Sequence, residues 1–74
     1  IATAGTSIFY AGSVMHHDTN ETGQTSAAVF PNGTNHYRLN ILLHAGFHIW
    51  LTAVSTTVWA ISGWVASVDA PTFT

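Results

Sequence analysis

The hydrophobic and polar positions divide the chain into an apolar beginning, a polar middle and a long uncharged second half. Residues 1–15 are apolar but mostly small, and they are too few for a helix that spans a bilayer, which needs about 20 residues. We therefore expect a short interfacial or packed helix there. Residues 16–38 are polar and include Pro31-Asn32-Gly33, which is a strong turn signal. We expect this segment to form a loop.

The second half of the chain predicts one long helix. Residues 39–68 contain no Asp, Glu, Lys or Arg, and as a helix they would extend for about 45 Å, more than the roughly 30 Å of a hydrocarbon core. Thr34 or Asn35 can cap its start, and Asp69-Ala70-Pro71 can stop it. The pattern therefore predicts a mainly α chain with a transmembrane helix at about 36–68. The alternative is a helix buried at the centre of a protein assembly.

The helical period divides this segment into two faces. One face is polar or small and would meet other membrane-protein subunits or copies of the same chain; it consists of His44, His48, Thr52, Ser55, Trp59, Ser62 and Ala66. The opposite face is apolar and would meet lipid; it consists of Phe47, Trp50, Val54, Val58, Ile61, Val65 and Val68. Residues 69–74 would follow the helix as a C-terminal tail.

Histidine is unusually frequent, with five in 74 residues. His44 and His48 are four residues apart, so on a helix both imidazoles would lie on one face, about 6 Å apart. One hypothesis is that His48 or His44 is the axial metal ligand of a tetrapyrrole, either chlorophyll or bacteriochlorophyll or haem, with Trp50 or Trp59 at the edge of the ring. Two alternatives stay open. Both rings could hydrogen-bond to neighbouring helices or lie at the membrane interface, or they could join a non-haem metal site with His16-His17-Asp18.

The outline resembles the small single-span antenna polypeptides of photosynthetic membranes, which have a short chain, an intramembrane histidine and tryptophans towards one end. Those chains typically carry a small residue four positions before the ligand histidine. Here Asn40 precedes His44 by four positions, and His44 precedes His48. The residues therefore assign no family, and the resemblance only suggests what such a helix can bind.

The charge and the composition exclude other classes of function. The chain has one Lys or Arg, three Asp or Glu and a formal net charge of −2, so it offers no positive surface to a nucleic acid. It has no cysteine, which excludes disulfides, thiolate metal sites and a cysteine nucleophile. We find no triad typical of an enzyme, and we expect no enzymatic activity.

These patterns together predict a small accessory or structural subunit of a photosynthetic or respiratory membrane complex, integral to the membrane through a single span. Arg38 directly precedes the span, which places the N-terminal side in the cytoplasm. The alternative is a self-assembling structural subunit of a filament or viral shell that binds no cofactor.

Overall fold

The structure is a computed structural model of the chain, and it describes residues 1–19, 25–42 and 44–74. Those residues form seven β-strands and no helix. The strands are β1 (Phe9–Gly12), β2 (Val14–Asp18), β3 (Ser26–Val29), β4 (Leu39–Asn40), β5 (His44–Ala53), β6 (Val58–Ser67) and β7 (Thr72–Phe73). The prediction of a mainly α chain is therefore wrong. Residues 1–15, expected as a short helix, contain β1 and the beginning of β2.

The segment predicted as a helix over 36–68 forms β4 and a hairpin of two ten-residue strands, β5 and β6. In the turn, the N–H of Val54 donates to the carbonyl of Val58 at 3.1 Å. The Ser55 hydroxyl accepts from the N–H groups of Thr57 at 3.2 Å and Val58 at 3.1 Å. β-Branched and aromatic residues are frequent in both strands and favour extended backbone. Most of the uncharged run is therefore two strands joined by a serine-threonine turn.

None of the residues that the structure describes forms a helix long and apolar enough to cross a membrane. This finding overturns the transmembrane helix at 39–68. It also overturns what rested on that helix: the single-span location with a cytoplasmic N-terminal side, and the role as a subunit of a membrane complex. The error arose because the absence of charge indicated a lipid-facing surface, whereas in a hairpin the same residues alternate between two faces of a sheet.

β6 is the central strand of the larger sheet. β1 and β2 pair in parallel with one side of β6, one after the other, and β5 pairs antiparallel with its other side. β3 pairs antiparallel with β2. Gly12, at the end of β1, has a φ of 95°, and a Cβ there would overlap the carbonyl oxygen of Ile61. Only glycine satisfies both conditions, so Gly12 keeps β1 and β2 close against the same strand.

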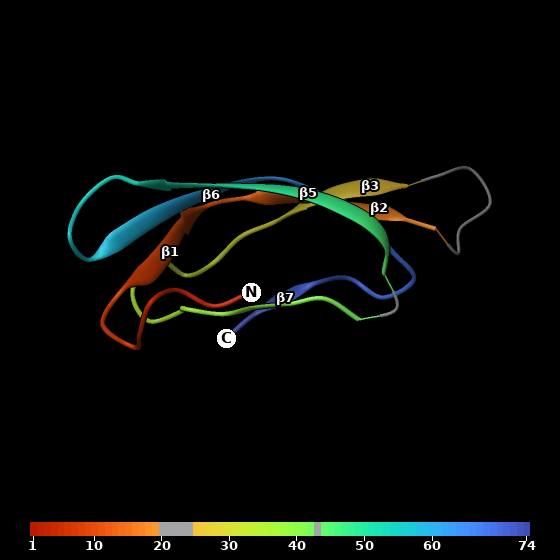
Figure 1. Ribbon diagram of the computed structural model, residues 1–74. Helices are drawn as coiled ribbons and strands as arrows, with labels where there is room; N and C mark the ends of the chain where they lie inside the picture. Colours follow the sequence, from red (N-terminus) through yellow and green to blue (C-terminus); the bar gives the residue numbers. More distant parts are fainter. Residues whose placement is uncertain (20–24, 43) are drawn as a thin grey trace.

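A small second layer lies beneath the larger sheet. β4 and β7 pair antiparallel, with Leu39 opposite Phe73, and Ala2 forms an isolated bridge with Arg38. Figure 1 shows β7 and the segment beside it under the arch of β5 and β6, with both ends of the chain in this layer. The second layer therefore covers one face of the larger sheet.

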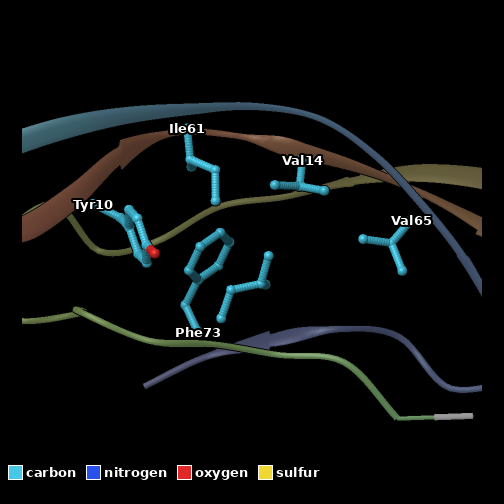
Figure 2. Packing of buried hydrophobic residues seen from close by; sticks show 6 residues of the cluster. Tyr10, Val14, Ile61, Val65 and Phe73 are labelled. Carbon is cyan, nitrogen blue, oxygen red and sulfur yellow. The ribbon is translucent and has the colours of Figure 1, made fainter. Parts of the chain in front are cut away.

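The hydrophobic core lies between the two layers. Tyr10, Val14, Ile61 and Val65 point from the larger sheet towards the second layer, and Phe73 points towards them from β7 (Figure 2). The rings of Tyr10 and Phe73 meet edge to face, with 5.8 Å between centroids and 67° between planes. Burial of an apolar side chain of this size stabilises the fold by about 1.5–3 kcal/mol. This core determines which face of the larger sheet is covered.

Candidate interaction surface

The larger sheet has an inner face, packed on the second layer, and an outer face. Along β6, Ile61, Val65 and Ser67 are buried on the inner face. Because side chains alternate along a strand, the residues between them lie on the outer face, and the strand register adds their neighbours. The outward positions are Met15 and His17 on β2, Gly46, His48, Trp50 and Thr52 on β5, and Ala60, Ser62, Trp64 and Ala66 on β6.

Five of these outward residues form one group, which we call the outer aromatic face: Met15, His17, His48, Trp50 and Trp64. All five are exposed. Trp50 is 53% exposed and Trp64 is 38% exposed. Tryptophan is usually well buried in a monomeric domain, so two exposed tryptophans on one sheet face are an unusual feature of the described surface.

The rings of His48 and Trp50 are stacked. Their centroids are 3.9 Å apart and their planes are inclined by 24°. The two residues are separated by one position on β5, so alternation places them on the same face of the sheet. The stack holds both rings in one orientation.

Trp64 connects the three strands of the outer face. It stands opposite Met15 on β2 and opposite His48 on β5. Its ring centroid is 6.2 Å from that of His17, at 58° between planes. The ring also reaches over Gly46, since a Cβ there would lie 3.7 Å from its Cη2 atom. Trp64 is therefore the centre of the outer aromatic face.

A hydrogen bond holds the histidine at the other side of this group. Nδ1 of His17 and the hydroxyl of Ser26 on β3 lie 2.7 Å apart. Both side chains are exposed. The bond leaves the second ring nitrogen of His17 as a polar group that can meet a ligand.

The outer face carries no charged residue at the outward positions of β2, β5 and β6 that the structure describes. Arg38 lies in the second layer, where it forms an isolated β-bridge with Ala2, and Asp69 follows β6. The described part of this surface therefore combines apolar rings with hydrogen-bonding groups and carries no Asp, Glu, Lys or Arg.

The inner face holds a different histidine. His16 is buried, and its Nε2 donates to the carbonyl of Ser67 at 3.1 Å. The carbonyl can only accept, so Nε2 carries the proton. The same carbonyl accepts from the N–H of Thr19 at 3.0 Å, and the Ser67 hydroxyl donates to the carbonyl of Asp69 at 2.6 Å. These bonds join β2 to the end of β6 and have a structural role.

The structure places the predicted ligand residues apart. His48 is exposed on the outer face, whereas Trp59 lies on the inner face and packs against the core. His44 begins β5 opposite Ser67, and its side chain lies outside the described residues. Four residues of strand extend for about 13 Å, twice the helical spacing. Ligation of a chlorophyll-type or haem metal by His48 or His44 stays a prediction. In the described part of the chain, no three His, Asp or Glu side chains form a group that could hold a metal ion.

The polar stripe expected on a helix is divided by the sheet. His48, Thr52, Ser62 and Ala66 point outward, whereas Trp59 points inward and Ser55 lies in the turn. The sequence interpretation missed Met15 and Trp64 as surface residues, and it placed Trp50 on the helix face opposite His48. The signal that could have found them is a period of two, which puts His48 with Trp50, and Ser62 with Trp64, on one face.

Comparisons of the chain with protein-family models, with curated proteins and with solved structures found no match. The functional argument rests on the outer aromatic face.

Proposed function

We propose that this chain is a protein-interaction domain that binds a different protein through its outer aromatic face. The observation that supports the proposal best is the exposure of Trp50 and Trp64, 53% and 38%, on one uncharged face of the sheet. Burial of both rings against a partner would be energetically favourable, because aromatic side chains have a large apolar area. The activity that we propose is binding rather than catalysis, and it requires no cofactor.

The composition of the face favours a protein partner. Protein interfaces are enriched in Trp, Tyr, Phe and Met and depleted in Lys, Glu and Asp. Tryptophan is also one of the residue types enriched at the positions that dominate binding energy. Here Trp64 stands opposite Met15 and His48, and Trp50 stands opposite Ser62. The face therefore resembles the centre of an interface more than an ordinary surface.

The orientation of the rings also supports binding. The stack of His48 on Trp50 and the contact of Trp64 with His17 hold the rings before a partner arrives. Less side-chain entropy is then lost on binding, about 0.5–1.5 kcal/mol for each side chain that is already ordered. Because the face lacks charge, its partner should present an uncharged, apolar surface, and the affinity should change little with salt.

Site-specific photo-cross-linking tests this proposal. A photoreactive phenylalanine derivative is placed at Ser62, which is exposed on the outer face opposite Trp50. The control position is Thr56, exposed at the tip of the β5–β6 turn. Both proteins are irradiated in the cells that produce the chain. We expect a protein adduct from position 62 and none from position 56.

A second comparison establishes the role of the tryptophans. The double variant with Trp50→Ser and Trp64→Ser, carrying the cross-linker at position 62, should give no adduct. Its far-ultraviolet circular dichroism spectrum should be unchanged. The proposal is wrong if both positions give the same adducts, if neither does, or if the adduct survives in the double variant. An adduct that contains only a second copy of the chain or a neutral polysaccharide would also contradict it.

A further inference from the structure

β5 is a long edge strand, and the described part of the chain shows none of the usual features that keep an edge strand from pairing with another chain. Among the described residues it pairs only with β6. Its ten residues, His44–Ala53, include no Asp, Glu, Lys, Arg or Pro. Natural edge strands usually carry a charge, a proline or a bulge in the middle, or are short, because an open edge can add another strand. The one irregularity of β5 lies at its start, between His44 and Gly46.

The hydrogen-bond pattern identifies the backbone groups at the open edge. The N–H of Val54 bonds to the carbonyl of Val58, and the register is regular from there back to Gly46 opposite Ala66. In an antiparallel ladder every second residue bonds to the partner strand. The even-numbered residues of β5 therefore bond to β6, whereas the N–H and C=O groups of Ile49, Leu51 and Ala53 point to the open edge.

We propose that two copies of the chain pair antiparallel through their β5 edges, around a twofold axis at Ile49. In this register Ile49 stands opposite the second copy's Ile49. Leu51 stands opposite the second copy's Phe47, and Trp50 stands opposite its His48. The two larger sheets become one continuous sheet, with both outer aromatic faces on the same side. The proposal does not depend on the proposed function.

The side chains of the edge are self-complementary in this register. The ring pair formed across the axis, Trp50 with His48, is the pair that already stacks within one chain. On the inner side, Leu51 and Phe47 are 41% and 46% exposed, and they would cover each other. Like charges opposite each other across the axis would oppose pairing. The strand contains no Asp, Glu, Lys or Arg, so no such pair arises.

Other registers fit less well. A shift of the centre to His48 or to Trp50 would place two identical rings opposite each other, and the first would also set Gly46 against Trp50. A register offset by one residue would turn the outer face of one copy towards the inner side of the other. The register centred on Ile49 is the one that pairs rings with rings and aliphatic with aromatic side chains on matching faces.

Sedimentation equilibrium over a range of concentrations is the first test. The wild-type chain should dimerise reversibly. Leu51→Lys adds a charge at the edge, and it should weaken the dimer by at least about tenfold. Val54→Lys adds the same charge just beyond β5, at a residue 60% exposed, and it should dimerise like the wild type. Circular dichroism spectra establish that each variant keeps the fold.

Disulfide formation tests the register itself, since the chain has no cysteine. Paired residues in an antiparallel ladder have Cα atoms about 5.5 Å apart, within disulfide range. Ile49→Cys should therefore form a covalent dimer under mild oxidation, whereas Leu51→Cys should not, because its own copy lies about 13 Å away. A monomeric wild type, equal dimerisation of all three proteins, or equal cross-linking of both cysteine variants would overturn the proposal. Trp64→Ser, which removes the centre of the outer aromatic face, should leave the dimer intact, and this separates the two proposals.

Discussion

The imidazole of His48 lies against the indole of Trp50, with 3.9 Å between ring centroids and 24° between planes. This contact requires the extended backbone of a strand. Residues two apart lie on the same face of a strand, but on nearly opposite sides of a helix. The same two residues that a helical period assigns to a polar and an apolar face therefore belong to one surface here.

Trp59 and Trp50 should differ in their effect on stability. Trp59 packs against the core, whereas Trp50 is exposed. We expect Trp59→Ala to lower the free energy of unfolding by about 2–4 kcal/mol and Trp50→Ala by about 1 kcal/mol or less. Urea unfolding followed by circular dichroism measures both. Equal losses would contradict the assignment of the inner and outer faces.

Two glycines of the hairpin should respond in opposite ways to alanine. Gly63 has a φ of 120°, and a Cβ there would overlap the carbonyl oxygen of His48 and lie 3.0 Å from the Cα of Ile49. Gly63→Ala should cost about 3 kcal/mol or more. Gly46→Ala would bring its methyl to an ordinary 3.7 Å from the Trp64 ring, so it should be neutral or stabilise by up to about 1 kcal/mol. Thermal denaturation of both variants decides.

Stability should fall at alkaline pH because of Tyr10. Its burial raises the pKa of the phenol above the ordinary value, so above about pH 10 the unfolded chain loses this proton before the folded chain does. The stabilisation is present below the unfolded pKa and is lost as the pH rises through the folded pKa. Tyr10→Phe should flatten the decline of unfolding free energy between pH 9 and 11, at the expense of the hydrogen bond to the Ile1 carbonyl. An unchanged slope would refute this explanation.

The two adjacent histidines of β2 should also differ in their effect on stability. His16 is buried and donates to Ser67, whereas His17 is exposed and bonds to the exposed Ser26. We expect His16→Ala to cost about 2–3 kcal/mol, from the lost bond and the space left behind. His17→Ala should change stability by about 0.5 kcal/mol or less. Guanidinium unfolding at neutral pH compares them, and a larger effect at His17 would reverse the assignment.

Part of this fold could have been predicted from the sequence. Phe47, Ile49 and Leu51 repeat with a period of two, and Val54–Thr57 separates two runs rich in β-branched and aromatic residues. That pattern is typical of a hairpin. It was ambiguous because the outer positions include tryptophan, so both faces are partly apolar and the uncharged run also satisfies the length of a spanning helix.

The rest of the fold depends on contacts between distant residues. Leu39 pairs with Phe73, and β1 and β2 pair with β6 across more than forty residues. No local pattern shows which sheet face the β4–β7 layer covers. The sequence indicates His48 as a candidate metal ligand, which stays a prediction, and the neighbours of His48 in space, Trp50 and Trp64, follow only from the strand register.

The measurement that tests the account most directly is the nuclear Overhauser contact between the Hα protons of Leu51 and Ile61. These residues stand opposite each other in β5 and β6 and alternate with the hydrogen-bonded pairs, so their Cα atoms should approach to about 4.5 Å. The outer aromatic face and the open edge of β5 both require this register. We predict a strong Hα–Hα contact between Leu51 and Ile61. Its absence, together with contacts from the Hα of His48 to the amide of Leu51 as in a helix, would contradict the account.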